Sequence, residues 1–202
     1  MSDDLPHSPA ADRNKEPILA QLRGILGERG TVLEIASGTG QHVVWFAAAF
    51  TGWTWQPTDS DPGMLPAIAE RIAQCGLANV LPPRQLDVQS LHWLPPTQRV
   101  DAIFCANMLH IAPWDACPAL MAGAARHLGP GGMLVTYGPY FEQDVPPAPG
   151  NVAFDESLRA RDPAWGIRVL EEVVAEAGRA GLVLAQRHAM PSNNLLLVFL
   201  RS

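Results

Sequence analysis

The chain has 202 residues, 48% of them hydrophobic, which is enough for one large globular domain with an apolar core. The net charge of −6 and the scattered positions of Lys and Arg argue against a nucleic-acid-binding surface. No apolar run approaches the roughly 20 residues that a membrane span needs, and the acidic, polar N-terminus is unlike a secretory signal. Three cysteines without C-x-x-C spacing predict reduced thiols in a cytoplasmic protein.

Segments with helical and strand periodicity alternate along the chain. Residues 1–12 are expected to form a flexible leader, and apolar residues at helical spacing follow over 12–28. Because Pro17 is tolerated only near a first turn, this helix is expected to begin close to Glu16. Further helices are predicted over 41–50, 61–76, 115–128 and 167–180. Strands are predicted over 31–36, 54–58, 80–86, 100–106, 133–137, 182–188 and 195–200.

Prolines qualify three of these predictions. Asp61, followed by proline, is typical of a helix start in which an acid caps the first turn. Pro82 and Pro83 place the third strand at a sheet edge, since proline lacks the N–H group that a central strand donates to its neighbours. Residues 138–166 are Pro-rich and lack periodicity, and so long a connection in a compact domain is usually a functional lid or binding loop.

The alternation of strands and helices predicts an α/β fold, with a mostly parallel sheet that carries helices on both faces. Seven strands are expected, and the short connection 189–194 indicates that the last two form an antiparallel pair. No linker suggests a second domain. We therefore expect one Rossmann-like domain over 31–202, preceded by a leader and capping helix over 1–30, with 138–166 as its lid.

The first predicted strand leads into a turn with two glycines, Gly38 and Gly40, and then into a helix. In an open parallel sheet such a turn lies at the carboxyl end of the strand, where ligands bind. Glycine also lets the backbone approach a ligand closely. A dinucleotide-binding turn has a third glycine, in the pattern G-x-G-x-x-G, but here Val43 occupies that position. Glu34 instead gives the pattern E-x-x-x-G-x-G.

This pattern resembles motif one of the class I methyltransferases, which bind S-adenosylmethionine (SAM). The resemblance implies that Glu34 orients the amino group of SAM and that Asp59 accepts hydrogen bonds from its ribose. It also implies that Asp87 accepts from the adenine amino group, and that Asn107 lies in the loop under the methionine part. The other cofactor contacts expected in this region are Ala36, Gly38, Gly40, Ser60, Met64 and Val88.

A narrower resemblance extends over nearly the whole chain. It is carried by the segments 8–18, 137–140, 154–159, 161–168 and 190–194. These segments are similar to the small family related to methyltransferase-like protein 26. The resemblance implies methyl transfer, but it does not identify the methyl acceptor.

Several polar and aromatic residues admit both a structural and a functional interpretation. Arg13 is either a solvated residue at a helix start or a bidentate partner of the SAM carboxylate. His110, after the fourth strand, is either a packed histidine or a general base that faces the substrate. Tyr140 and Phe141 either pack the lid or line the substrate cavity. We predict His110 and Tyr140 as the catalytic residues and Arg13 as a cofactor ligand.

The remaining candidates are more simply structural. Trp114 and Trp165 are interpreted as packing residues, and Asn193 and Asn194 as turn residues that also approach the lid. His42 is interpreted as structural or as lying at the edge of the ligand. Three arginines in and after the lid are either solvated or form an anion-binding pocket: Arg159, Arg161 and Arg168. No spacing of His, Cys and Asp predicts a metal site.

The sequence therefore predicts SAM-dependent methyl transfer to a small molecule by direct in-line attack, with no nucleic-acid or membrane partner. Such a reaction depends on alignment, since positioning alone contributes roughly 7–11 kcal/mol. Three alternatives remain open. One is a nicotinamide-dependent oxidoreductase, which Asp59 would also suit but which Val43 disfavours. The others are a SAM-binding regulatory module without catalysis and an interaction scaffold that binds no cofactor.

Overall fold

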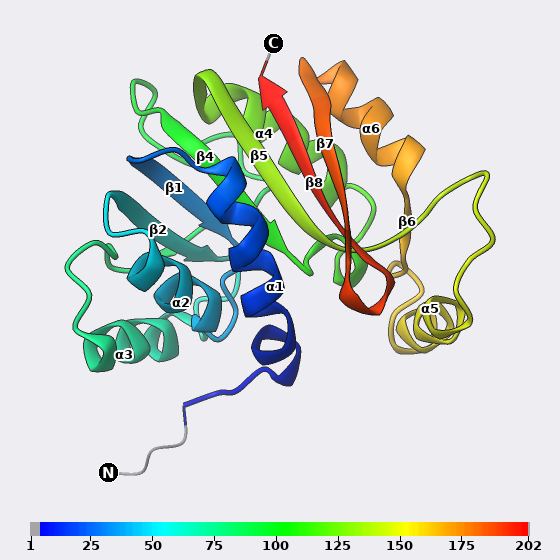
Figure 1. The fold of residues 1–202 in the computed structure, drawn as a ribbon, viewed down its shortest axis with the longest axis horizontal. Helices are drawn as coiled ribbons and strands as arrows, with labels where there is room; N and C mark the ends of the chain where they lie inside the picture. Colours follow the sequence, from blue (N-terminus) through cyan, green and yellow to red (C-terminus); the bar gives the residue numbers. More distant parts are fainter. Residues whose placement is uncertain (1–4, 202) are drawn as a thin grey trace.

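A computed structural model describes residues 5–201 of the chain, in which one twisted sheet lies between two layers of helices (Figure 1). Residues 1–4 of the expected leader lie outside this range, as does residue 202. The strands are β1 (Gly30–Ile35), β2 (Trp53–Asp59), β3 (Arg84–Gln85), β4 (Val100–Ala106), β5 (Leu128–Phe141), β6 (Arg168–Val169), β7 (Leu182–Met190) and β8 (Asn194–Arg201).

The sheet has the predicted order of parallel and antiparallel strands. Seven strands lie in the order β3-β2-β1-β4-β5-β8-β7, and the short β6 pairs with the end of β5. Strands β1 to β5 run parallel to one another, whereas β8 runs antiparallel to both β5 and β7. The carboxyl ends of β1, β2 and β4 therefore meet at one edge, which is where a ligand binds in an open sheet of this kind.

The helices are α1 (Pro9–Ile25), α2 (Gln41–Ala49), α3 (Leu65–Cys75), α4 (Ala116–His127), α5 (Pro149–Arg161) and α6 (Leu170–Arg179). Helices α1 and α2 cover one face of the sheet, and α4 and α6 cover the other (Figure 1). Helix α5 lies apart from both layers, beyond the carboxyl end of β5 (Figure 1). Two short 3-10 helices, Leu109–Ile111 and Pro191–Asn193, complete the secondary structure.

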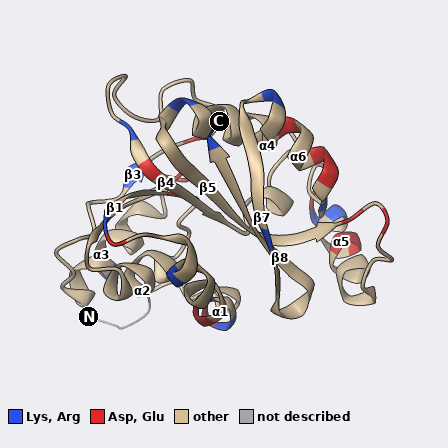
Figure 2. Ribbon diagram, turned by 45° about the horizontal axis from the view of Figure 1, so that its top comes forward, with Lys and Arg blue, Asp and Glu red and all other residues tan. Residues whose placement is uncertain are grey.

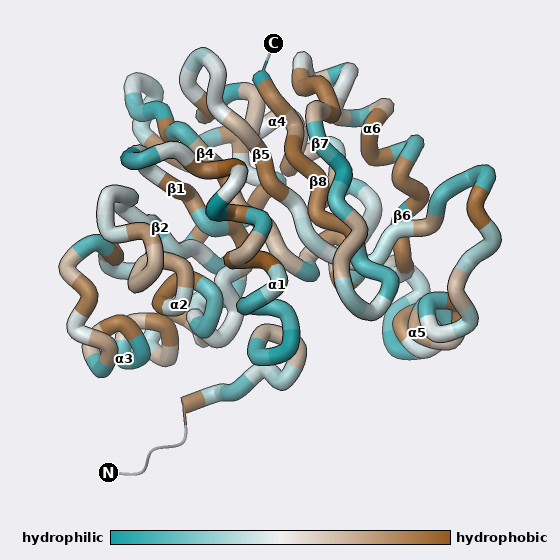
Figure 3. The backbone as a smooth tube through the Cα atoms, in the orientation of Figure 1, coloured by the Kyte–Doolittle hydropathy of each residue, from teal (hydrophilic) through white to brown (hydrophobic). Residues whose placement is uncertain are grey.

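Alternation along the strands divides the apolar residues between two cores. Leu33 and Ile103 belong to the core under α4 and α6, while their neighbours Val32 and Phe104 belong to the core under α1 and α2. Successive side chains of a strand point to opposite faces, so strands covered on both faces are apolar at nearly every position. Hydrophobic residues are accordingly concentrated along the central strands (Figure 3).

The first helix begins earlier than the sequence predicted. It starts at Pro9, after Ser8, whose hydroxyl accepts a hydrogen bond from the N–H group of Ala11. Pro17 therefore lies inside the helix, where it removes one backbone hydrogen bond. The helix continues because its apolar face, with Ile18 fully buried, packs against the sheet layer.

The edge strand and the third helix are both shorter than predicted. Only Arg84–Gln85 forms a strand there, and Val80 contributes an isolated bridge to Trp55, because the two prolines between them interrupt the pairing. Helix α3 begins at Leu65 instead of near Asp61. The carboxylate of Asp61 accepts a hydrogen bond from the N–H group of Gly63, which forms a local turn before the helix.

The predicted lid contains regular structure. Strand β5 continues to Phe141, helix α5 occupies 149–161, and β6 precedes α6, which starts at Leu170 instead of near residue 167. Helix α5 buries little of its surface, with Asn151 and Leu158 as its buried residues, and this explains its weak hydrophobic periodicity. None of the helices within residues 5–201 combines the length and apolar character that crossing a bilayer requires.

Candidate functional site

The chain reverses direction sharply between β1 and α2, in the segment that we call the glycine turn (residues 36–40). Its backbone has positive φ at Ala36 (55°), Gly38 (55°) and Gly40 (74°). Glycine adopts such angles freely, but alanine does so only under strain, and strained backbone of this kind is often found at functional sites. Asn107 has a φ of 59° at the end of the adjacent β4, so two neighbouring strands end in left-handed residues.

Side chains at the strand ends hold the glycine turn in place. One carboxylate oxygen of Asp59 accepts a hydrogen bond from the N–H group of Gly38 at 2.8 Å, and the other accepts from Asp61 at 3.0 Å. The hydroxyl of Ser37 donates to the buried carboxylate of Glu34 at 2.7 Å. Burial, with a smaller contribution from the nearby charge of Asp59, raises the pKa of Glu34 to about 7 against the opposing effect of the Ser37 hydrogen bond. Glu34 therefore supports the turn from beneath it.

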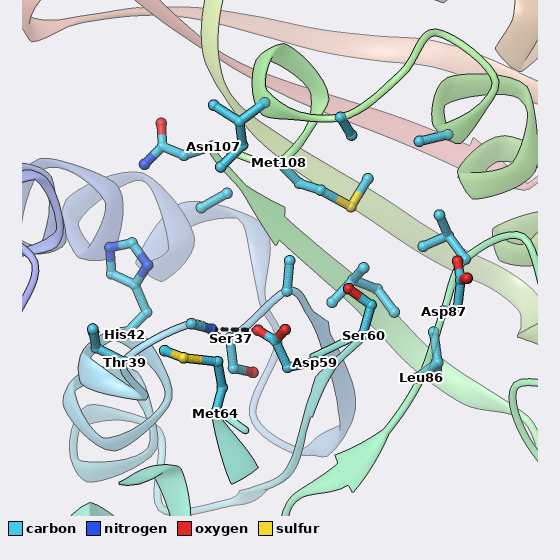
Figure 4. A pocket seen from close by; sticks show the side chains of 18 of the residues that line it. Ser37, Thr39, His42, Asp59, Ser60, Met64, Leu86, Asp87, Asn107 and Met108 are labelled. Carbon is cyan, nitrogen blue, oxygen red and sulfur yellow. Dashed lines mark hydrogen bonds between the residues drawn. The ribbon is translucent and has the colours of Figure 1, made fainter. Parts of the chain in front are cut away.

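A first cavity of about 580 Å³ opens on the glycine turn (Figure 4). The carboxylates of Asp59 and Asp87 stand on its walls with Ser60, and Met108 closes another side (Figure 4). Other residues that line this cavity are Ala36, Ser37, Gly38, Thr39, His42, Met64, Leu86, Val88, Gln89, Asn107 and Ile111. The cavity thus combines apolar walls with two carboxylates and a turn of exposed backbone.

A second cavity, also of about 580 Å³, lies between α1, α5 and the loop after β7. It shares Ser8, Asn107 and Ile111 with the first cavity, so the two spaces adjoin at the carboxyl end of β4. Its lining residues include Arg13, Asn14, His110, Tyr137, Asn151, Phe154, Asn193 and Asn194. A ligand in one cavity is therefore within reach of a ligand in the other.

Two histidines at the site are buried and neutral. Burial lowers the pKa of His42 to about 4, and Nε2 of its ring lies 2.7 Å from the side-chain oxygen of Asn14. Burial and the charge of Arg168 lower the pKa of His110 to about 4. The ring of His110 packs edge-on against Phe154 of α5, and its backbone oxygen accepts from the N–H group of Gly166. His110 thus faces the second cavity while the lid segment holds its backbone.

The structure places Tyr140 apart from both cavities, contrary to its predicted role in catalysis. Its side chain is buried in the core under α4 and α6, and its hydroxyl lies 2.9 Å from that of Thr136. Burial raises its pKa far above the usual range. Because β5 continues past residue 137, Tyr140 and Tyr137 lie three positions apart on one strand and point to opposite faces. Tyr137 is the tyrosine that lines the second cavity.

The three arginines of the lid region are each engaged by other groups of the chain, and two of them, Arg159 and Arg168, line a common cavity with Glu172 and Glu176. Arg159 pairs with Asp155 at 2.7 Å, and Arg161 lies over the ring of Trp165. Arg168 donates to the backbone oxygens of three residues: Leu109, Ala112 and Ala164. Arg168 therefore ties the lid to the loop that carries His110.

The other predicted site residues separate into three groups. The first cavity is lined by Ala36, Gly38, Asp59, Ser60, Met64, Asp87, Val88 and Asn107. Glu34 and Gly40 lie behind it, where they shape the turn. Arg13 lines the second cavity instead of the first.

Sequence reasoning missed Asn14 and Tyr137. Asn14 is buried at 7% exposure on the same face of α1 as Ala11 and Ile18, and it lines the second cavity. The signal that could have identified Asn14 is a polar residue within the apolar stripe of a helix. Tyr137 was expected to be the last residue of a strand, so its side chain was not assigned to a face of the sheet.

The charges of the site are local rather than part of a larger field. Lys and Arg are scattered over the ribbon and form no basic stripe (Figure 2). Throughout residues 5–201, His, Cys, Asp and Glu side chains nowhere gather in a group of three suited to a metal ion.

Solved structures share this architecture. The chain superimposes on an O-methyltransferase family protein from Burkholderia thailandensis with a TM-score of 0.80 at 19% identity, covering 96% of this chain and 57% of that one. It matches an O-methyltransferase family 2 protein from Planctomyces limnophilus, in complex with apigenin, with a TM-score of 0.75 at 19% identity, covering 93% and 62%. The chain also matches a putative sarcosine dimethylglycine methyltransferase from Galdieria sulphuraria with a TM-score of 0.75 at 15% identity, covering 98% of this chain and 94% of that one.

These likenesses concern the fold. The chain spans a little over half the length of the first two proteins and nearly all of the third. The single α/β domain, with its mostly parallel sheet and antiparallel last pair, is the fold of class I methyltransferases, as the sequence predicted. A family model described as "Protein of unknown function (DUF938)" matches residues 5–201, and the chain belongs to that family.

Proposed function

We propose that this chain is a SAM-dependent methyltransferase that acts on a small-molecule acceptor. One observation carries the proposal: a cavity of ligand size opens on the glycine turn, with Asp59 and Asp87 at the ends of neighbouring strands on its walls (Figure 4). Structural neighbours with the same fold are methyltransferases, which supports the same chemistry here. The narrower kinship with methyltransferase-like protein 26 is part of the proposal.

The residues of the first cavity suit the different parts of SAM. Asp59 already accepts two backbone hydrogen bonds, but a carboxylate has about four acceptor positions, so it still has capacity for ribose hydroxyls. Asp87 would accept from the adenine amino group, and Leu86 and Val88 beside it offer apolar walls for the ring. The glycine turn leaves backbone open beside the amino-acid tail. When bound, SAM supplies an electrophilic methyl group on its sulfonium.

The helix after the glycine turn argues against a dinucleotide. Val43 holds the position of the third glycine of the dinucleotide fingerprint, and its side chain is fully buried in the core between α2 and the sheet. That third glycine serves close packing of helix and strand. Since Val43 fills this contact with a branched side chain, the turn is built differently from a pyrophosphate-binding one.

The second cavity is the proposed place of the methyl acceptor. It adjoins the first cavity at Asn107, so an acceptor there is held against the methyl donor. Helix α5 covers this side and limits access of water, through contacts such as that of Phe154 with His110. Neutral His110 can accept a proton from the acceptor, although a pKa of about 4 makes it a weak base. Alignment and water exclusion would then carry most of the rate.

Calorimetric titration of the purified protein with SAM, S-adenosylhomocysteine and NADH tests the cofactor assignment. We expect binding of the first two and none of NADH. Incubation with SAM and a metabolite library, with detection of S-adenosylhomocysteine, then tests catalysis. Binding without turnover would point to a regulatory module. Tight binding of NADH without SAM would point to an oxidoreductase, and binding of neither would point to a scaffold.

A further inference from the structure

We infer that the second cavity recognises a carboxylate on the methyl acceptor, which it binds through the guanidinium of Arg13 and the hydroxyl of Tyr137. The acceptor would then be a small monocarboxylic acid rather than a neutral molecule or a phosphate ester. The inference deepens the proposed function and rests on it. It also gives Arg13 a partner different from the SAM carboxylate that the sequence suggested.

The positive charge of Arg13 has no partner within the described part of the chain. Among residues 5–201, its guanidinium has no hydrogen-bond acceptor and no carboxylate partner. The adjacent Asp12 is already engaged by His7 and by Lys15. No Asp or Glu is among the described residues that line the second cavity. Arg13 therefore presents up to five N–H donors on the wall of a cavity that has no internal counter-ion.

Tyr137 lines the second cavity together with Asn14, whose side chain is held by His42. A carbonyl oxygen only accepts, so the side-chain oxygen of Asn14 takes its hydrogen bond from the ring of His42, 2.7 Å away. The amide nitrogen of Asn14 is therefore the group left to interact with the Tyr137 phenol, and this interaction lowers the pKa of the phenol. Within residues 5–201 no oxygen accepts the proton of that phenol, so the hydroxyl can donate into the cavity.

The protonation state of Tyr137 agrees with this geometry. Burial raises its pKa, while the Asn14 hydrogen bond and the positive charge of Arg13 lower it in part. The phenol therefore stays neutral and retains its proton at physiological pH. The phenol and the Arg13 guanidinium are both donors, and both line the second cavity.

The charges and walls of the second cavity favour a carboxylate over a phosphate. One cation and one neutral hydroxyl match the single charge and two oxygens of a carboxylate. A phosphate dianion would keep a net negative charge in a partly buried cavity with no second cation, which is costly. The rest of the wall includes Phe154, Ile111 and Pro139, so the body of the ligand is apolar or aromatic. The cavity volume, about 580 Å³, lies within the usual range for small molecules.

Calorimetric titration of the protein saturated with S-adenosylhomocysteine tests the inference. The probes are benzoate, phenylacetate, cinnamate and 4-hydroxybenzoate, each compared with its uncharged primary amide. We expect at least one acid to bind about tenfold or more tightly than its amide, since the amide lacks the charge. Arg13→Gln should remove at least about tenfold of that affinity, and Tyr137→Phe a smaller part. Arg13→Lys should recover part of the loss.

The matched control is Arg23→Gln, which removes an exposed arginine from the last turn of the same helix. This variant should bind the acids as the wild type does, and circular dichroism should show that all variants remain folded. The inference is overturned if no acid binds better than its amide, or if Arg13→Gln binds the acids normally. It is also overturned if Arg13→Gln weakens S-adenosylhomocysteine instead, because Arg13 would then serve the cofactor.

Failure of the proposed function gives a different result. If the wild-type protein does not bind S-adenosylhomocysteine, the assignment of the first cavity is wrong. The same acids and amides are then titrated without it. Preference for an acid that depends on Arg13 would still establish carboxylate recognition by the second cavity, and absence of that preference would refute it.

Discussion

The hydroxyl of Ser37 donates a hydrogen bond of 2.7 Å to the carboxylate of Glu34, which is 2% exposed beneath the glycine turn. The sequence suggested that Glu34 touches the amino group of the cofactor. In the structure this acid lies on β1, behind the wall of the first cavity, where it holds Ser37 while the Ser37 N–H group donates to the backbone oxygen of Thr58. Glu34 thus shapes the turn on which the first cavity opens.

This burial predicts a pH-dependent stability. The pKa of Glu34 is raised from 4.5 to about 7 on folding, so its contribution is fully present below the unfolded value and is lost as the pH rises through about 7. Glu34→Gln keeps an oxygen for Ser37 but has no proton to lose. Between about pH 5 and pH 8, the free energy of unfolding of the wild type should fall relative to Glu34→Gln by on the order of 2 kcal/mol. Urea unfolding across this range measures it.

The control is Glu28→Gln, at an exposed position on the loop before β1. Its stability should follow the wild type at every pH. Parallel curves for the wild type and Glu34→Gln would show that Glu34 does not change its protonation state on folding.

Asp59 has two functions, and its substitution should separate them. Asp59→Ala removes the acceptor for the Gly38 N–H group as well as the proposed ribose contact, so both thermal stability and SAM affinity should fall. We expect a loss of binding free energy of more than about 1 kcal/mol, since charge-assisted hydrogen bonds are removed. Asp59→Asn keeps an oxygen for the Gly38 N–H group but loses the acceptor of the Asp61 N–H group, so it should lose affinity with a smaller loss of stability than Asp59→Ala. Calorimetry with S-adenosylhomocysteine and thermal unfolding give the two values.

Asp144→Asn, at an exposed position in the lid, is the control and should leave both values unchanged. Unchanged cofactor affinity in Asp59→Ala would refute the assignment of Asp59 to the ribose.

Much of the fold was predictable because strands covered on both faces are apolar throughout. The strand over 100–106 was predicted with its observed bounds, and its neighbours on either side, β1 and β5, run parallel to it. Where local rules and tertiary packing disagreed, packing prevailed. Pro17 suggested a late helix start, but Ser8 caps an earlier one and Ile18 anchors it in the core. Helix α5 was not predicted, because so few of its side chains face the core.

The first cavity was more predictable than the second. Asp59 and Asp87 end neighbouring parallel strands, and topology brings such positions to one edge of the sheet. The second cavity draws residues from α1, α5 and the loop after β7, and no sequence spacing relates these segments. Tyr140 was assigned to the lid and the substrate cavity because the strand was expected to end at residue 137. A strand that continues fixes the face of each side chain by alternation.

The left-handed backbone at Gly40 predicts that a larger residue at this position destabilises the fold. Gly40 has a φ of 74°, and an added Cβ atom would lie 3.3 Å from the Ile68 side chain. Gly40→Ala should therefore destabilise the fold by about 1–2 kcal/mol. Gly24→Ala, in the last turns of α1, meets no atom within 4 Å and should stabilise by up to about 1 kcal/mol. Urea unfolding measures both, and changes of the same sign would contradict the assigned turn geometry.

Arg168 connects the lid to the loop that carries His110, and its loss should loosen that loop. The guanidinium donates to the backbone oxygens of Leu109 and Ala112, so Arg168→Ala leaves these acceptors without their partner. We expect a loss of stability of about 1–3 kcal/mol. Hydrogen exchange of the Gly166 N–H group, whose acceptor is the His110 oxygen, should accelerate. Arg161→Ala removes only an exposed stack on Trp165 and should change stability by no more than about 0.5 kcal/mol. Equal effects of the two substitutions would show that Arg168 does not hold the loop.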